Sequence, residues 1–121
     1  MAVRVRRLLK RQDFLRLKSL GGRVSTQAFV LQWLDVPEED GLGVGFTASG
    51  ALGGAVKRNR ARRRLKAAFD EACRCNPECR FAGEAKGRWL VMVAKMPMFE
   101  IDYTYLMKDM RKALAEAGLV C

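Results

Sequence analysis

The sequence contains no histidine, few prolines and no long hydrophobic run, and each absence narrows what the protein can do. Without an imidazole side chain, catalytic schemes that use histidine as the general base are excluded. The best apolar run, WLVMVA, has six residues, whereas a membrane-spanning helix needs about 20. The N-terminal stretch MAVRVRRLLKR lacks the apolar segment of a signal peptide. We therefore expect a cytoplasmic protein that has no membrane partner.

Acidic residues are scarce relative to basic ones: 13 Asp and Glu face 23 Lys and Arg, which gives a net charge of +10. The excess positive charge is unevenly distributed along the sequence. The segment KRNRARRRLK at 57–66 carries +7, and the first eighteen residues hold seven basic side chains against Asp13 alone. Clustered positive charge is typical of nucleic-acid binding, whereas a surface that only confers solubility intersperses both signs. The charge pattern therefore favours a polyanionic partner.

The length of 121 residues, with half of them apolar, predicts one domain over 1–121 with a single modest core. In a cytoplasmic protein its four cysteines are expected to be reduced thiols: Cys73, Cys75, Cys79 and Cys121. Their spacing is not CxxC and no histidine completes a ligand set, so we predict no metal site. The acidic residues 38–40 lie in an evident turn, PEEDG, which indicates a solvated loop and not a magnesium cluster.

Hydrophobic periodicity in the first half predicts a helix and two main strands. The spacing of leucines and Phe14 indicates a short helix over 7–20 that stops at Gly21-Gly22. Residues 29–34 form a strand that is apolar on both faces, with a short strand expected before it near Val24. Residues 42–49 form a second strand, antiparallel to the first across the short PEEDG loop.

The second half adds a helix, a strand and a closing helix. Ala61, Leu65, Ala68, Phe69 and Ala72 recur at helical spacing and form one apolar stripe. A polar loop at 74–88 precedes a buried-type strand at 89–95. The closing helix at 103–117 has Asp102 as its N-terminal cap and Gly118 after its end. The pattern predicts an α+β sandwich.

The basic side chains are placed around the outside of the first of these two helices. Arg62, Arg63 and Lys66 project away from the apolar stripe, and Arg60 lies nearly opposite to it. Arg58 falls in the first turn and is expected at the rim of the sheet. Asn59 fits two roles equally, a cap for the helix or a contact to a base edge. Arginine matches phosphate oxygens bidentately, so this helix suits RNA.

The stretch VGFTASGALGGAVKRNRARRRLKAAF at 44–69 resembles the signature of the protein subunit of bacterial ribonuclease P. It shows a strand, a glycine-containing loop, Ala-Val, then Arg-Asn-Arg, further basic residues and Leu65-x-x-x-Phe69. The resemblance covers essentially the whole chain. It implies a ferredoxin-like α-β sandwich, roughly αβββαβα, with a left-handed βαβ crossover.

The resemblance also implies a function as protein cofactor of a ribozyme that removes the 5′ leader from precursor tRNA. The partners are then ribonuclease P RNA and precursor tRNA, with one protein chain for each catalytic RNA. The chemistry, Mg²⁺-assisted phosphodiester hydrolysis, belongs to the RNA. We therefore expect no catalytic residue and no directly bound cofactor in this chain.

Two sets of side chains follow from the resemblance. The set expected to contact the catalytic RNA is Arg58, Asn59, Arg60, Arg62, Arg63 and Lys66. The set expected in a cleft for the single-stranded leader is Phe14, Lys18, Val30, Gln32 and Thr47, with Val30 and Thr47 on the same face of neighbouring strands. Gln32 and Lys18 stand where aromatic residues are frequent, which weakens stacking with leader bases.

Three other functions compete on composition alone. A DNA-binding module would need a partner helix or a dimer, and neither heptads nor a tight helix-turn-helix is present. A stand-alone nuclease lacks the residues for acid–base or two-metal chemistry. A ribosomal or assembly-type RNA-binding protein fits the composition equally well, and only the order of the motifs argues against it.

Overall fold

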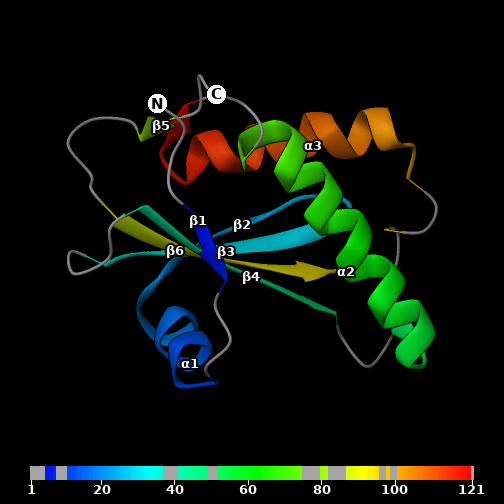
Figure 1. The fold of residues 1–121 in the computed structure, drawn as a ribbon, viewed down its shortest axis with the longest axis horizontal. Coiled ribbons are helices and arrows are strands. Elements are labelled where there is room, and N and C mark those ends of the chain that lie inside the picture. The colour runs from blue at the N-terminus through cyan, green and yellow to red at the C-terminus, as the bar shows by residue number, and fades with distance from the viewer. Residues whose placement is uncertain are drawn as a thin grey trace.

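The computed structural model of the chain contains a mixed β-sheet with helices on both faces. It describes residues 5–7, 11–36, 41–48, 52–74, 80–81, 87–95, 98 and 101–120. The helix Arg11–Leu20 lies on one side of the sheet, and the helices Ala55–Phe69 and Tyr103–Glu116 lie on the other (Figure 1). The elements are, in order, β1 (Val5–Arg7), α1 (Arg11–Leu20), β2 (Gly22–Ser25), β3 (Phe29–Asp35), β4 (Gly41–Ala48), α2 (Ala55–Phe69), a π-helical turn (Asp70–Arg74), β5 (Arg80–Phe81), β6 (Gly87–Ala94), α3 (Tyr103–Glu116) and β7 (Leu119–Val120).

The predicted α+β class and the order αβββαβα are confirmed by α1, β2, β3, β4, α2, β6 and α3. The short strand expected near Val24 is β2. The short strands β1, β5 and β7 were not predicted, because two or three residues carry no usable periodicity. Among the described residues, no helix is both long and apolar enough to cross a membrane.

The five-stranded sheet has the order β1-β4-β6-β3-β2. Strands β1 and β6 are parallel to β4, whereas β3 is antiparallel to β6 and to β2. The predicted pairing of residues 42–49 with 29–34 across the turn is therefore wrong. The two strands do run in opposite directions, but β6 lies between them. Strand β6 is apolar on both faces, and such a strand is most stable at the centre of a sheet.

The connection from β4 through α2 to β6 joins two parallel, adjacent strands and is the crossover that the resemblance implies. Its left-handed sense stays a prediction. The crossover carries the arginine-rich helix across one face of the sheet, where α2 packs beside α3 (Figure 1).

The main core fills the space between the sheet and these two helices. The predicted stripe, which runs along α2 and into the π-helical turn, is buried in full, with Ala61, Leu65, Ala68, Phe69 and Ala72 each at most 2% exposed. From α3 the buried residues include Leu106, Met110, Ala113 and Leu114. This burial leaves the basic side chains of α2 on the rest of the helix surface.

Helix α1 covers the opposite face of the sheet (Figure 1). A second, smaller hydrophobic cluster lies under it. Leu17 from α1 packs there with Val36, Trp89 and Val91, and Phe14 adds a half-buried ring. The sequence left open whether Trp89 belongs to an interface or to the core. The structure places it in this cluster, 6% exposed, with the Arg16 guanidinium 5.2 Å from the centre of its ring.

Both predicted signals at the ends of α3 are confirmed. The Asp102 carboxylate accepts a hydrogen bond of 3.2 Å from the backbone N–H of Thr104 and so caps the N-terminus. Gly118 follows the last turn with φ near +90°, a conformation that glycine adopts without steric cost.

Candidate nucleic-acid interface

The basic helix α2 begins without any acidic residue in its first turn and without a side-chain cap. Gly54 is the N-cap residue, with extended backbone angles, and the backbone N–H of Arg58 donates to its carbonyl oxygen at 3.1 Å. The positive end of the helix dipole therefore adds to the charge of Lys57 and Arg58 instead of being neutralised. Such an end favours an anionic partner.

Asn59 is exposed and its Oδ1 accepts a hydrogen bond of 2.5 Å from Nη1 of Arg62. The helix starts four residues before Asn59, so the hypothesis that Asn59 caps it is wrong. The contact orients Arg62, and both side chains lie on the same flank of α2 one turn apart. A contact between Asn59 and a base edge stays a prediction.

The cations of α2 differ in their surroundings. Lys57, Arg60 and Arg63 are exposed, whereas Arg58 is half-buried and its Nε has no hydrogen-bond partner among the described residues. The expected position of Arg58 at the rim of the sheet stays a prediction. Lys66 forms an ion pair of 3.0 Å with Asp70, and 43% of its side chain is exposed. The exposed arginines are therefore the most available to a phosphate backbone.

Arg64 serves a structural purpose instead. Its guanidinium donates to the carbonyl oxygens of Met98 and Ile101, which lie just before α3. Arg64 therefore joins α2 to the segment that leads into α3. The sequence gives no sign of this structural role, because no local pattern distinguishes Arg64 from its exposed neighbour Arg63.

Two ionisable side chains near the end of α2 have raised pKa values. The Tyr103 hydroxyl donates to Oε2 of Glu71 at 2.9 Å and links the start of α3 to the turn after α2. Burial, together with this hydrogen bond, raises the pKa of Tyr103. Cys73 is 1% exposed, and burial raises the pKa of its thiol to about 11. Its thiol is therefore a neutral packing group at neutral pH.

The face of the sheet under α1 brings together the residues expected in the leader cleft. The strand register places Val30 of β3, Val93 of β6 and Thr47 of β4 in one row across the sheet. Val30 and Thr47 thus share a face as predicted, but they are not on neighbouring strands. Val93 lies between them and was missed, because the position of β6 in the sheet was not predicted.

The next row across the same face consists of Gln32, Val91 and Gly45. A Cβ atom on Gly45 would lie 2.6 Å from the Phe14 ring, so the ring packs directly over this glycine. Gln32 and Thr47 are half-buried beside it, and Val30 is 8% exposed. Four of the five expected residues therefore lie on one surface, which we call the α1 face: Phe14, Val30, Gln32 and Thr47.

The remaining site predictions fall outside the described residues or side chains. Lys18 belongs to α1, but its side chain is not described. Cys75, Cys79 and Cys121 and the acidic residues 38–40 also lie outside the described residues. Within the part of the chain that the structure describes, no three His, Cys, Asp or Glu side chains gather as metal ligands.

Arg7 of β1 was counted only as one of the N-terminal charges, and the structure gives it a definite place. It lines a hollow of about 520 Å³ together with Val56, Asn59, Arg62 and Arg63 of α2. The hollow exists because β1 pairs with β4 at the sheet edge next to α2. A three-residue strand gives no sequence signal for such a placement.

The fold and its charge define a small basic α+β protein with an arginine-rich crossover helix on one face of its sheet. The sequence model of the ribonuclease P family matches residues 3–118. The ribonuclease P protein component of Gluconacetobacter diazotrophicus is 35% identical over 98% of this chain and 97% of its own length. That of Paramagnetospirillum magneticum is also 35% identical, over 98% of this chain and 86% of its own length. The chain belongs to the ribonuclease P protein family, and its function is that of the protein component in tRNA 5′-end processing.

Solved structures agree on the fold. A Staphylococcus aureus ribonuclease P protein, a mutant with defective mRNA degradation activity, aligns with a TM-score of 0.76 and 21% identity, covering 94% of this chain and 89% of that one. The ribonuclease P protein of Thermotoga maritima aligns with a TM-score of 0.67 and 22% identity, covering 92% of this chain and 93% of that one. The α-β sandwich is therefore the family fold.

Proposed function

We propose that this chain binds a catalytic ribonuclease P RNA through α2 and supports cleavage of precursor tRNA by that RNA. The exposed face of α2 carries this proposal, because Lys57, Arg60 and Arg63 project from a helix whose first turn has no acidic residue. Arg58, Asn59, Arg62 and Lys66 extend the same surface. Closely spaced phosphates of a folded RNA relieve the repulsion among these cations.

In this proposal the phosphodiester hydrolysis is carried by the RNA and its Mg²⁺, and the protein supplies no catalytic residue. One protein chain serves each catalytic RNA, in the cytoplasm. The protein acts by neutralising phosphates, which lowers the Mg²⁺ concentration that the RNA requires. The whole chain acts as a single RNA-binding domain.

The experiment is cleavage of a precursor tRNA by a bacterial ribonuclease P RNA at low, near-physiological Mg²⁺, with and without this protein. We expect the protein to restore 5′ maturation and the variant R60A/R63A to restore it poorly. The matched control is K108A/R111A, because both of these side chains are exposed on α3 and their removal changes net charge by the same amount. Equal activity of the two variants would refute the role of α2.

A second surface, the α1 face, is proposed to receive the single-stranded 5′ leader. Phe14, Gln32 and Thr47 are half-buried there beside Val30, and they offer both apolar and polar groups to an unpaired strand. Lys18 remains a predicted contact to the leader. Gln32 lies in the same row as Gly45, over which the Phe14 ring packs. A base that enters there meets one aromatic ring and an amide that can bond its edge.

The variant Q32Y tests this surface by adding a second aromatic ring to the α1 face, beside that of Phe14. We expect the complex of protein and catalytic RNA to bind precursor tRNA several-fold more tightly, because stacking on an aromatic side chain contributes about 1–3 kcal/mol per base. Mature tRNA, which has no leader, provides the control and should bind unchanged. A gain that is equal for both substrates would show that Gln32 does not face the leader.

A further inference from the structure

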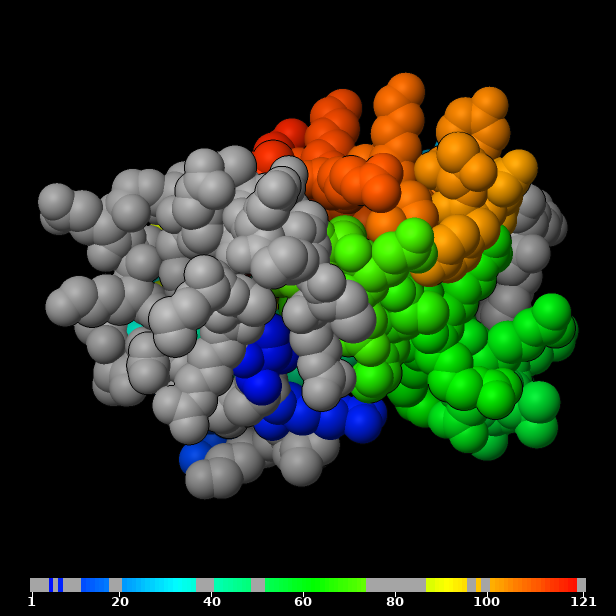
Figure 2. Space-filling model, turned by 45° about the horizontal axis from the view of Figure 1, so that its top comes forward, coloured from blue at the N-terminus to red at the C-terminus, as the bar shows by residue number. Residues whose placement is uncertain are grey.

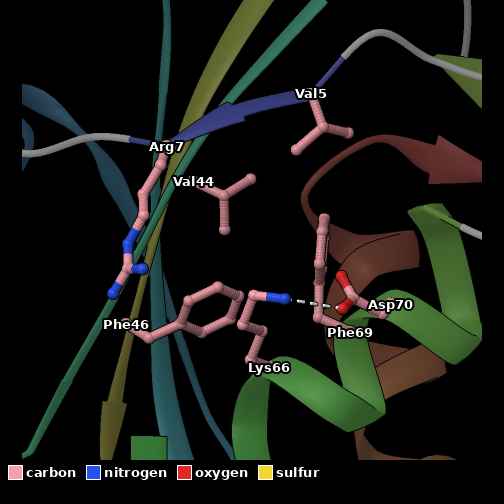
Figure 3. A pocket seen from close by; sticks show the side chains of 7 residues that line it. All are labelled: Val5, Arg7, Val44, Phe46, Lys66, Phe69 and Asp70. Carbon is pink, nitrogen blue, oxygen red and sulfur yellow. Dashed lines mark hydrogen bonds and ion pairs between the residues drawn. The ribbon is translucent and has the colours of Figure 1, made fainter. Parts of the chain in front are cut away.

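A small cavity lies between β1, β4 and α2 next to the basic hollow described above (Figure 3). It has a volume of about 170 Å³ and is lined by Val5, Arg7, Val44, Phe46, Lys66, Phe69 and Asp70. Arg7 lines both the cavity and the hollow, so the two lie next to each other. β1, in dark blue, reaches the molecular surface beside α2, in green (Figure 2). We call this surface the β1–α2 groove.

One flank of α2 supplies a complete wall of the groove. Its lining residues recur every three or four positions, with adjacent pairs at two of the steps: Val56, Asn59, Arg62 with Arg63, Lys66, and Phe69 with Asp70. Residues at this spacing lie on one face of a helix. This face adjoins the apolar stripe, so the groove has cations along its length and apolar side chains at its inner end.

The charge along the groove is strongly positive. Arg7, Arg62, Arg63 and Lys66 line it, against Asp70 as the acidic residue among the lining side chains. A single strand of nucleic acid can follow such a groove with its phosphates on the arginines. Its bases then face the apolar end of the groove.

The cavity has the chemistry of a site for one base. Strand residues Val5, Val44 and Phe46 face α2 across it, and Lys66, Phe69 and Asp70 form the other side (Figure 3). Phe46 is half-buried and packs edge-to-face on Phe69, with ring centres 5.8 Å apart. Part of the Phe46 ring therefore remains available to a stacking partner.

The volume of the cavity matches that of one six-membered ring. A protein cavity of about 150 Å³ accommodates a benzene molecule, so about 170 Å³ suits the six-membered ring of a pyrimidine and is small for a purine. Lys66 Nζ and Asp70 Oδ2, 3.0 Å apart, supply a donor and an acceptor at the cavity wall. Base edges require both, and a carboxylate accepts from the amino group of cytosine.

We propose that the β1–α2 groove binds an unpaired segment of the RNA partner and that the cavity receives one extruded pyrimidine base. Arg7 neutralises a neighbouring phosphate, Phe46 stacks with the base, and Lys66 with Asp70 bonds its edge. The proposal rests on the proposed function, because it takes ribonuclease P RNA as the ligand. It adds a pocket for one base beside a helix whose exposed arginines are proposed to contact phosphates.

The variant V5F fills the cavity without changing any charge. Val5 is half-buried on β1, at one edge of the sheet, and Val24 is half-buried on β2, at the other edge, so V24F is the matched control. The probe is a bacterial ribonuclease P RNA, and its affinity for each variant is measured at one salt concentration. We expect V5F to bind about tenfold more weakly than the wild type and V24F to bind unchanged, since stacking of one base accounts for such a factor.

Base-specific chemical probing of unpaired cytosines and uracils locates the effect. The wild type and V24F should protect one pyrimidine that V5F leaves reactive, while protection of phosphates along the RNA stays the same. Thermal unfolding establishes that V5F is folded. If it is not, F46L provides the test, because leucine retains apolar packing against Phe69 and removes the stacking face.

The outcomes separate this proposal from the function on which it rests. Tight binding of the wild type, with equal affinity and equal base protection for the cavity variant, overturns the base site alone. An absence of binding by the wild type overturns both. Loss of one protected pyrimidine in the cavity variant supports the base site.

Discussion

At the scale of single residues, the contact between Gly45 and Phe14 sets how closely α1 approaches the sheet. A Cβ atom at position 45 would lie 2.6 Å from the Phe14 ring, well inside van der Waals contact. We expect G45A to lower the free energy of unfolding by about 1–3 kcal/mol, because the ring must move off the strand. In a double-mutant cycle measured by denaturant unfolding, F14L should recover part of this loss. Strictly additive losses would show that the two residues do not interact.

Cys73 gives the molecule a specific sensitivity to alkaline pH. Burial raises the pKa of its thiol from 9.0 to about 11. Below pH 9 both the folded and the unfolded chain hold the proton, so the thiol does not make stability depend on pH. Between pH 9 and 11 the unfolded chain releases it first, which favours unfolding by about 2 kcal/mol at pH 10.5.

The measurement is denaturant unfolding of the wild type and of C73A at pH 8 and at pH 10.5. The wild type should lose about 2 kcal/mol more than C73A between the two conditions. C73A is expected to be less stable at pH 8, because it leaves a small void in the core. Parallel losses in the two proteins would mean that the folded chain ionises this thiol as readily as the unfolded one.

At the scale of elements, the start of α2 shows a conflict between stability and RNA binding. Gly54 has φ −73° and ψ 179°, angles open to any residue, and a Cβ atom there would meet nothing within 4 Å. A serine cap should therefore stabilise the helix by about 0.5 kcal/mol, and an aspartate cap by about 1 kcal/mol through the dipole and nearby cations.

The two caps are predicted to differ in their effect on RNA. G54S should bind ribonuclease P RNA as tightly as the wild type, whereas G54D should bind several-fold more weakly because it places a negative charge beside Lys57 and Arg58. Thermal unfolding and RNA affinity, measured on both variants, test this. If G54D bound as well as G54S, the N-terminal end of α2 would lie away from the RNA.

The helices and the longer strands were largely predictable from the sequence, but the pairing of strands in the sheet was not. The stripe Ala61–Ala72 and the cap at Asp102 each depend on residues close in sequence, and both are confirmed. The pairing of β3 with β4 was predicted from the short PEEDG loop, yet β6 separates the two strands. Which strands pair depends on contacts across long stretches of chain, and local pattern does not report those contacts.

At the scale of the whole molecule, the two faces of the sheet differ in what covers them. α2 and α3 cover one face and present the arginines, and α1 covers the other beside the half-buried Gln32 and Thr47. The charge pattern alone predicted the first surface. It did not distinguish Arg64, which bonds the carbonyls of Met98 and Ile101, from the exposed arginines, because that difference arises only when α3 packs beside α2.

The salt dependence of RNA binding distinguishes an effect of the protein's net charge from an effect of the position of its cations on α2. R60A/R63A and K108A/R111A each lower the net charge from +10 to +8. If α2 is the surface that displaces counterions, only R60A/R63A should flatten the plot of log K against log[salt], by about 1.4 in slope, or about 0.7 for each cation. Isothermal binding to ribonuclease P RNA over a series of salt concentrations measures this slope. Equal slopes for the two variants would mean that net charge, and not the arginine face of α2, determines the affinity of this protein for RNA.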